Sequence, residues 1–453
     1  MTIAAAVAAV VGDGAVITDP DVADAYRHDQ TPMLDAGRPA VVCFASSTQE
    51  VAAVMRIASE TRTPVVTRGA GSGLAGGANA VDGCIVLVTT RMDRVLEVDP
   101  LNQLARVQPG VLNAAVKAAA AQHGLSYPPD PASYAFSTIG GNIATNAGGL
   151  CCVKYGVTGD YVLGLEAVLA DGRVLRTGRS TVKGVAGYDL TSLLVGSEGT
   201  LAVITEATLR LRPAPGRTST MVAVFPTLVA AGRAVVEISR AGVVPSLLEL
   251  MDHTTIVAVD DWQHMDLDRD AAALLLAQSD SADGGGTAAI AAACSQAGAD
   301  FAVETDDPDE GEMLLAARRF AYPALERLGA TLLDDVCVPR SRIPELVEGV
   351  EDIARSHAVT VGTFGHAGDG NLHPTFVYER GSEAAEQVVL RAFDDVVRLA
   401  LSLGGTVSGE HGIGLLKRGH LADELGPVSV DVHRAVKAAF DPLGILNPGK
   451  SIP

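Results

Sequence analysis

Apolar and polar positions repeat with clear periods along this chain. Residues 1–14 (MTIAAAVAAVVGDG) are typical of a first helix, and residues 40–44 (AVVCF) form an apolar run typical of a buried strand. The stretch STQEVAAVMRIASET, residues 47–61, repeats apolar side chains at helical spacing and opens with a Ser/Thr cap and an early Glu. The pattern therefore predicts a strand followed by an amphipathic helix.

Short β-rich runs dominate the rest of the first half. They are PVVTR (64–68), CIVLVT (84–89), RVLEVD (94–99) and LARVQPG (104–110). An alanine-rich helix is expected over residues 113–124 and a hairpin over residues 161–178, with its turn at Asp171-Gly172. The stretch GSEGTLAVITEATLRLRP, residues 196–213, completes this half.

Pro213 and Pro215 indicate a boundary, and β-α-β patterns follow it. The first unit is a strand at 220–226, a helix at 227–241 and a strand at 246–250; the second is 271–280, a helix near 286–298 and 301–305. Two successive units of this kind predict a ferredoxin-like antiparallel sheet. A further helix is expected over 309–328 and a surface loop over 279–286. The expected class is α+β, with domains at 1–212 and 213–453.

Composition and charge narrow the function. The net charge is −20, without a basic stripe, which argues against nucleic-acid binding. No stretch reaches the length of a membrane span, and the apolar start lacks the basic region of a signal peptide. The six cysteines follow neither the spacing of a disulfide framework nor a CxxC pattern. We expect a reduced, cytoplasmic protein, either free or peripheral at the inner face of the membrane.

Two glycine-rich blocks indicate a large polar ligand. The first, TRGAGSGLAGGANA at residues 67–80, contains G-x-G-x-x-G but is followed by a β-rich run and not by the helix of a Rossmann turn. We interpret it as a loop whose backbone amides bind phosphate; a mere tight turn is the alternative. The second, residues 127–149, adds loop amides and polar side chains at Ser137, Thr138, Gly140, Gly141, Asn142, Thr145, Asn146, Gly148 and Gly149.

Histidines and one glutamate form a candidate metal site in the second half. FGHAGDGNLHP places His366 and His373 seven residues apart, and VSGEHGIG joins Glu410 to His411. Two imidazoles and a carboxylate match a catalytic zinc site or a similar divalent site; hydrogen-bonded structural histidines are the alternative. A metal lowers the pKa of a bound alcohol, and an adjacent histidine can take the proton while hydride leaves for the cofactor. This combination favours oxidation of a hydroxy compound.

Several motifs in order also resemble a known family. VTRGAGSGLAGG, PPDPASYAFSTIGGNIATNAGG, VKGVAGYDL, GSEGTLAVIT, GHAGDGNLH, SGEHGIG and FDPLGILNPGK are similar to FAD-linked oxidoreductases of the vanillyl-alcohol-oxidase superfamily. The branch holds the glycolate oxidase D subunit, D-lactate dehydrogenases and D-2-hydroxyglutarate dehydrogenase. The resemblance implies an N-terminal PCMH-type FAD-binding domain of two α/β subdomains. A C-terminal ferredoxin-like substrate domain with flanking helices follows.

The resemblance also assigns the cofactor residues. Residues 67–74 would cradle the FAD diphosphate, residues 130–149 would follow the rest of the cofactor, and Asn447 would approach the flavin. Relatives with covalent flavin carry a histidine in the glycine loop, which is absent here, so FAD is expected to be non-covalent. Besides the second-block residues named above, the implied contacts are Arg68, Gly69, Ala70, Gly71, Ser72, Gly73, Leu74, Pro129, Asp130, Glu198, Gly199, Ile204 and Asn447.

By the same resemblance His366, His373 and Glu410 bind zinc or another divalent ion, and His411 is the base. Arg318 would bind the substrate carboxylate, with Arg319 as runner-up, and Tyr322, one helical turn away, would add a hydrogen bond. The 2-hydroxyglutarate enzymes carry a lysine where this chain has Leu333, followed by Asp334 and Asp335. This departure favours D-lactate- or glycolate-like substrates.

The expected activity is oxidation of a small D-2-hydroxy acid to the 2-oxo acid, with metal-assisted proton removal and hydride transfer to flavin N5. The alternatives are a D-2-hydroxyglutarate dehydrogenase, an FAD-using alkyl-transferase, the FAD subunit of a multi-subunit glycolate oxidase and a flavin-free metal hydrolase. The electron acceptor stays open between quinone, cytochrome, electron-transfer flavoprotein and oxygen. The expected partners are a second copy in a homodimer or an iron–sulfur subunit, since the chain has no ferredoxin cysteine pattern.

Overall fold

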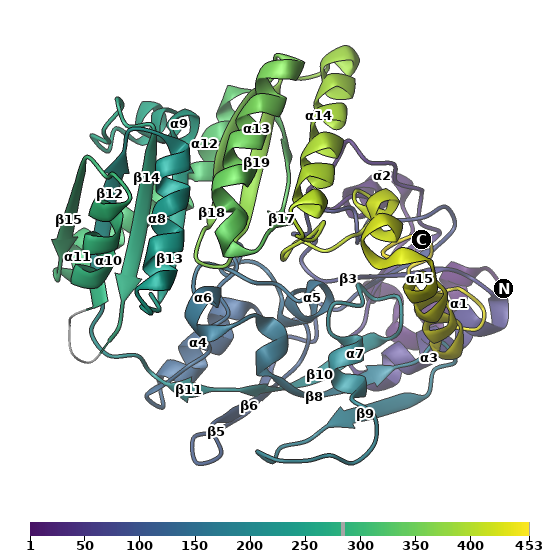
Figure 1. Cartoon of the computed structure of the whole chain (residues 1–453). Helices are drawn as coiled ribbons and strands as arrows, with labels where there is room; N and C mark the ends of the chain where they lie inside the picture. Colours follow the sequence, from purple (N-terminus) through teal and green to yellow (C-terminus); the bar gives the residue numbers. More distant parts are fainter. Residues whose placement is uncertain (282–285, 453) are drawn as a thin grey trace. The chain divides into compact units, whose positions relative to one another are not determined.

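The computed structural model describes residues 1–281 and 286–452 (Figure 1). The chain forms two compact units. The first contains Met1–Gly148, Val157–Ala214 and Glu410–Pro453, and the second contains Gly149–Gly156 and Pro215–Gly409. Each unit is therefore built from segments that are not continuous in the sequence. The two continuous domains expected at 1–212 and 213–453 stay a prediction.

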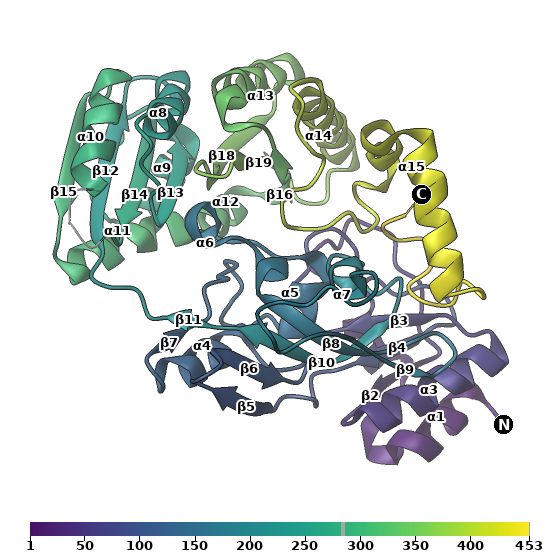
Figure 2. The ribbon, with the colours of Figure 1, turned by 60° about the horizontal axis from the view of Figure 1, so that its bottom comes forward.

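Apolar strands and an amphipathic helix form the first sheet of the first unit. Ser47 caps α3 (Thr48–Thr61) by accepting the Glu50 N–H, and the helix buries Val54 and Met55. Helix α1 (Ile3–Val11) packs beside α3, as Figure 2 shows. The sheet has the order β1–β2–β4–β3, with parallel pairing among the last three, and its strands are β1 (Val16–Ile17), β2 (Val41–Phe44), β3 (Val65–Arg68) and β4 (Ile85–Val88). The predicted strand, helix and strand over 40–68 are confirmed.

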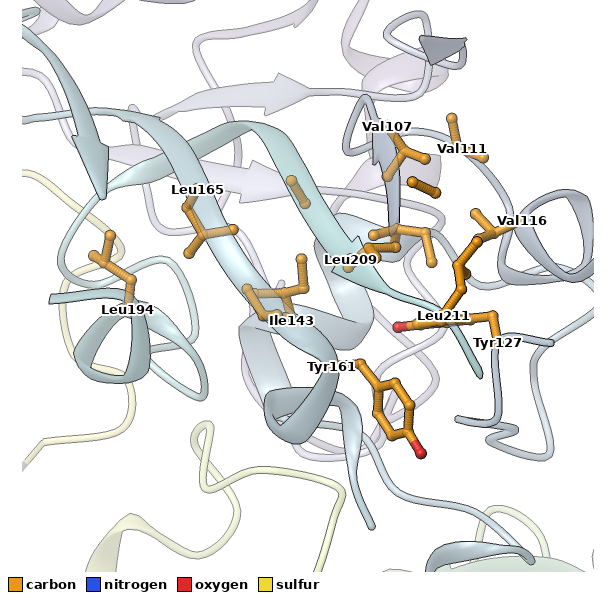
Figure 3. Close-up of a cluster of buried hydrophobic side chains, with 14 of the residues drawn as sticks. Val107, Val111, Val116, Tyr127, Ile143, Tyr161, Leu165, Leu194, Leu209 and Leu211 are labelled. Atoms are coloured by element: carbon orange, nitrogen blue, oxygen red, sulfur yellow. The ribbon is translucent and has the colours of Figure 1, made fainter. Parts of the chain in front are cut away.

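An antiparallel sheet with the order β5–β6–β10–β8–β9 forms the other layer of this unit. Its core is drawn in Figure 3, where Tyr127 and Tyr161 meet edge to face with ring centroids 5.8 Å apart. Val116 of α4 (Asn113–Ala121) and Ile143 of α5 (Ile139–Thr145) enter the same core. The strands are β5 (Val95–Asp99), β6 (Leu104–Val107), β8 (Val162–Val168), β9 (Val174–Gly178) and β10 (Val203–Arg210).

Helix α5 corrects the expectation that the second glycine block is loop throughout. The Thr138 hydroxyl accepts the Gly141 N–H at 3.3 Å and caps the start of the helix, and Asn146, with φ 53°, follows its last residue. Glycine lowers helix propensity by about 1 kcal/mol per residue. Burial of Ile139 and Ile143, one turn apart, offsets this cost and gives the segment a helical face.

The second unit contains a sheet with the order β15–β12–β14–β13–β18–β19–β16, in which every pair is antiparallel, and β17 joins β19. The first four strands, together with helices α8 (Leu228–Arg240) and α10 (Gly286–Gln296), give the predicted ferredoxin-like order. The sequence did not predict the extension by β18, β19 and β16. The strands are β12 (Ser219–Phe225), β13 (Leu247–Asp252), β14 (Ala273–Ser279), β15 (Phe301–Thr305), β16 (Ala330–Leu333), β17 (Val336–Cys337), β18 (Thr360–His366) and β19 (Asn371–Tyr378).

The helix expected over 309–328 is two helices, α11 (Pro308–Arg319) and α12 (Ala321–Leu328), which separate at Phe320. Part of the loop expected over 279–286 lies outside the described residues. The other helices of this unit are α6 (Cys152–Tyr155), α8 (Leu228–Arg240), α9 (His253–Gln263), α10 (Gly286–Gln296), α13 (Ile343–His357) and α14 (Glu383–Ser402).

The C-terminal segment returns to the first unit. Helix α15 (Leu421–Phe440) is kinked at Gly426 and Pro427. After it, Leu446 is fully buried and forms a β-bridge with Val65. Among the described residues, no helix combines the length and the apolar character needed to cross a membrane.

Candidate active site

The two glycine-rich blocks of the first unit lie against each other. A Cβ on Gly69 would stand 2.3 Å from the Thr138 hydroxyl oxygen, and a Cβ on Gly140 would stand 2.7 Å from the Pro109 side chain. Gly71 has φ +73°, a conformation that favours glycine. The first block therefore approaches Thr138 of the second as closely as it does because Gly69 has no side chain, and Gly140 in the same way allows the second block to lie against Pro109.

Buried polar atoms beside this contact lack partners among the described residues. They include one terminal nitrogen of Arg68 (Nη1) and one carboxylate oxygen of Asp29 (Oδ2), which faces Gly73. Burial lowers the pKa of the Arg68 guanidinium. The Arg68 guanidinium is a cationic donor next to a glycine cradle, so Arg68 and the cradle fit a diphosphate-bearing cofactor such as FAD, whereas the Asp29 carboxyl does not contribute to binding an anion.

Several predicted cofactor residues use their side chains within the protein. The Asn142 amide bonds to Ser137 and Asn113, and the Asn146 side chain accepts the Gly159 N–H at 2.8 Å. The Asn447 amide donates to Gly77 O at 2.9 Å and to Glu198 O at 2.7 Å. These side chains hold the loops in place, so contact of these residues with FAD stays a prediction.

Glu198 connects three parts of the first unit. Its backbone N–H donates to Ala144 O, and its two carboxylate oxygens accept the N–H groups of Ile413 and Gly414, each at 2.8 Å. Burial raises the pKa of the Glu198 carboxyl. The observed role of this side chain is to hold the turn that follows His411, whereas its contact with FAD stays a prediction.

The remaining predicted cofactor positions divide between the units. Gly149 begins the short Gly149–Gly156 segment of the second unit. The others belong to the first unit: Ala70, Ser72, Leu74, Pro129, Asp130, Thr145, Gly148, Gly199 and Ile204.

In the second unit, the β18–β19 hairpin brings the predicted histidines together. Phe364 pairs with His373 and His366 with Asn371, so His366 and His373 lie diagonally on one face of the sheet. Their ring centroids are 5.1 Å apart, and their ligand nitrogens lie within 4.8 Å. Both side chains are buried. The pair fits two ligands of a divalent metal ion.

A buried carboxylate and a buried guanidinium extend this face. Glu249 of β13 accepts from His366 Nδ1 at 2.8 Å through Oε1, and its Oε2 lies 2.7 Å from Arg318 Nε. The Arg318 guanidinium lies over the Phe364 ring, 4.7 Å from its centroid. Arg318 is only 6% exposed. Arginine is rarely buried to this extent in proteins unless its charge is paired.

Arg319 and Tyr322 have different surroundings. Arg319 forms an ion pair with Glu312 on the surface of α11. Tyr322 lies in the first turn of a separate helix, α12, which corrects the assumption that it lies one turn from Arg318 on a continuous helix. Its hydroxyl lies 3.3 Å from Thr331 Oγ1, and burial raises its pKa to about 12. Arg318 is therefore the better candidate for binding an anion.

Glu410 and His411 open the last segment of the first unit, with Glu410 Oε1 3.9 Å from His411 Nε2. The residue before them, Gly409, ends the second unit, and its N–H donates to Asp335 O at 3.2 Å. Asp335 is buried, and its carboxylate accepts from Asn371 Nδ2 and Ser408 Oγ, both at 2.8 Å. His373 Nδ1 lies 3.8 Å from the same carboxylate.

Sequence reasoning missed Glu249 and the supporting role of Asp335. The signal for Glu249 was present, because SLLEL places one carboxylate inside an otherwise apolar buried strand. Such a charge is costly without partners, so its position alone indicates a paired group.

Comparison with known protein families identifies both halves. Residues 39–178 match the family described as FAD binding domain, and residues 214–451 match the family described as FAD linked oxidases, C-terminal domain. The chain belongs to the FAD-linked oxidases. This FAD-linked oxidase is thus an FAD-dependent oxidoreductase, as the motifs predicted, with the expected PCMH-type FAD-binding fold and C-terminal domain.

Named relatives cover nearly the whole chain. The glycolate oxidase subunit GlcD of Bacillus subtilis is 42% identical over 94% of this chain and 91% of its own length. The D-lactate dehydrogenase of Archaeoglobus fulgidus is 42% identical over 95% and 96%. Among solved structures, 4-ethylphenol oxidase from Gulosibacter chungangensis aligns with TM-score 0.82 and 19% identity, covering 99% of this chain and 96% of its own. That likeness shows the fold alone.

Proposed function

We propose that this FAD-linked oxidase is a dehydrogenase of small D-2-hydroxy acids, of the D-lactate or glycolate type, and forms the 2-oxo acid. The relatives named for glycolate and D-lactate support the substrate class. The observation that carries the proposal is a buried arginine, Arg318, on the same sheet face as the pair His366 and His373. An anion-binding group beside a metal-binding pair suits a carboxylate with a neighbouring hydroxyl.

Arg318 binds the substrate carboxylate in this proposal. Its Nε is paired with Glu249, and no other ion pair or hydrogen bond of Arg318 is found within residues 1–281 and 286–452. The two terminal nitrogens can therefore hold one carboxylate as a fork. Tyr322 is proposed to support this site through a hydrogen bond.

His366, His373 and Glu410 hold the metal in this proposal. The two histidines offer neighbouring nitrogens, and Glu410 follows Gly409, whose backbone is bonded to Asp335 near His373. A divalent ion of this kind lowers the pKa of a hydroxyl bound to it. His411 takes the hydroxyl proton, and zinc is the ion that the nitrogen and carboxylate donors favour.

FAD, bound without a covalent bond, would accept the hydride at its atom N5. The substrate loses the hydrogen on C2 as hydride and its hydroxyl hydrogen as a proton, so the alcohol becomes a ketone or aldehyde. Arg318 and the metal ligands fix the substrate so that both losses occur from one orientation. Leu333, which is 8% exposed and apolar, offers no cation for a second carboxylate and supports small substrates over 2-hydroxyglutarate.

Anaerobic mixing tests the proposal. D-lactate or glycolate is expected to bleach the flavin absorbance of the purified protein, with D-2-hydroxyglutarate at least tenfold slower. Chelator treatment is expected to slow the bleaching, and added Zn²⁺ to restore it. Failure of every D-2-hydroxy acid to reduce the flavin would contradict the assignment.

A second candidate function is the FAD-carrying subunit of a multi-subunit oxidase that needs its partners for turnover. Support for it comes from the word subunit in the names of the Bacillus subtilis and Escherichia coli relatives. Flavin reduction by substrate without transfer to quinone, cytochrome, electron-transfer flavoprotein or oxygen would favour this alternative, with an iron–sulfur subunit as the missing partner. A homodimer of this chain, which would need no added subunit for electron transfer, is the other expected assembly. The predicted location, cytoplasmic or peripheral at the inner membrane face, stays a prediction.

A further inference from the structure

Glu249 places a charged side chain inside an apolar strand, where burial of a charge is unfavourable. Its side chain is fully buried, and its neighbours on β13, Leu248 and Leu250, are buried apolar residues. Burying a carboxylate costs several kcal/mol unless it is paired and hydrogen-bonded. Here each oxygen has its own partner, His366 on β18 and Arg318 on α11.

The bond to His366 decides which ring nitrogen can bind a metal. Because Oε1 accepts from Nδ1 at 2.8 Å, the proton of the neutral ring resides on Nδ1 and the lone pair on Nε2. The same bond fixes the rotation of the ring. A carboxylate behind a metal-binding histidine raises its basicity and metal affinity.

The ion pair with Arg318 decides which edge of the guanidinium is left for the substrate. With Nε 2.7 Å from Oε2 and the Phe364 ring beneath the guanidinium, the plane of Arg318 is held from two sides. The terminal nitrogens then form the remaining fork. A single carboxylate therefore orients both a metal ligand and the anion-binding group.

We propose that Glu249 is a positioning residue that couples metal affinity to recognition of the substrate carboxylate. The inference rests on the proposed function for the roles of His366 and Arg318. Removing the charge at residue 249 weakens metal binding by His366 and carboxylate binding by Arg318, because the imidazole ring and the guanidinium are both oriented by the Glu249 carboxylate. A carboxylate that only stabilised the core would leave both roles intact in the folded protein.

The test is Glu249→Gln in the full-length FAD-loaded protein. Glutamine has the same shape, but it has no charge to pair with Arg318, and its single amide oxygen cannot meet both His366 and Arg318. Affinity for Co²⁺ alone, measured by competition with a chelator and by the Co²⁺ absorption spectrum, is expected to fall about 10- to 100-fold. The KM for D-lactate is expected to rise at least tenfold, with FAD content unchanged.

The second unit offers a matched control. Asp395 also joins a histidine and an arginine, with Oδ2 2.8 Å from His357 Nε2 and Oδ1 3.0 Å from Arg398 Nη1. Asp395→Asn removes the same kind of bridge on the surface and is expected to change neither Co²⁺ affinity nor KM. Equal losses in both variants would overturn the inference, because the effect would then not belong to Glu249.

The outcomes separate this inference from the proposed function. If the wild type binds Co²⁺ and Glu249→Gln binds it as tightly, the inference is wrong while the proposed function stands. If no hydroxy acid reduces the flavin, the proposed function fails, but the Co²⁺ measurement still decides the effect of Glu249 on metal binding. Should the glutamine variant not fold, Glu249→Asp retains the charge but shortens the reach, and unchanged Co²⁺ affinity in that variant would overturn the inference.

Discussion

Arg318 and Arg319 are neighbours with opposite surroundings, so they form a matched pair for substitution. Arg318 is buried against Glu249 and Phe364, whereas Arg319 is exposed beside Glu312. Lysine retains the charge but lacks the planar fork. Arg318→Lys is expected to raise the KM for D-lactate about 10- to 100-fold, because one or two charge-assisted hydrogen bonds to the substrate carboxylate are lost. Arg319→Lys is expected to have a KM near that of the wild type. Steady-state kinetics of both variants tests this, and similar KM values would contradict the assignment.

Lys450 allows a prediction about pH. Burial lowers its pKa from 10.5 to about 8, with its amine donating to Asn447 Oδ1 at 3.0 Å. Between these values the unfolded chain binds more protons than the folded one, so this group increases the free energy of unfolding as pH rises from about 8 to about 10. Relative to Lys450→Met, which lacks the titration, the wild type is expected to gain on the order of 1–3 kcal/mol across this window. Denaturant unfolding of both proteins at several pH values measures the difference; a constant difference would contradict it.

At the scale of elements, the contact between the glycine blocks can be tested by adding one methyl group. Gly69→Ala would place a Cβ 2.3 Å from the Thr138 oxygen at the cap of α5, so the loop or the helix start must move. FAD content of the purified protein is expected to fall several-fold. Gly14→Ala is the control, because no atom lies within 4 Å of its added Cβ and its φ is ordinary. Equal FAD content in the two variants would show that this contact does not shape the cofactor site.

Local patterns predicted most elements of the first three hundred residues. Helix α3 could be read from its cap and apolar spacing, and the ferredoxin-like strands from their alternation with helices. Helix α5 could not be predicted, because its glycines disfavour a helix and its apolar face is short. That face stabilises a helix only when it packs against the sheet. The break at Phe320 was missed for a related reason, since each flanking stretch is helical by composition.

The candidate site shows the same limit. Residue types in the glycine-rich motifs indicated His366 and His373, the family resemblance indicated Arg318, and the structure places all three on one face of the second unit. Glu249 lies more than a hundred residues before His366 and has no motif of its own. Only strand pairing between β13 and β18 brings it to the histidine, so no local pattern could reveal the bond.

At the scale of the whole molecule, the last segment belongs to the core of the first unit. Leu446 is fully buried beside Val65, whereas Leu443, three residues earlier, is 43% exposed. Leu446→Ala is expected to lower the free energy of unfolding by about 2–5 kcal/mol and to reduce FAD retention. Leu443→Ala is expected to stay within about 0.5 kcal/mol of wild type. Denaturant titration and flavin release on heating measure both; similar values would place the segment outside the core.

The interleaved course of the chain restricts how such enzymes can be recombined. A chimaera joined at residue 214 would combine the FAD-binding half of one parent with a foreign Glu410–Pro453 segment, including the Leu446 strand bridge and the turn held by Glu198. Crossovers at residues 214 and 409 together would instead transplant Pro215–Gly409, the larger part of the second unit, while the first unit keeps its native last segment. If substrate recognition lies in the second unit, as proposed above, exchanges of substrate preference between relatives should succeed with this internal segment and fail when everything after residue 214 is exchanged.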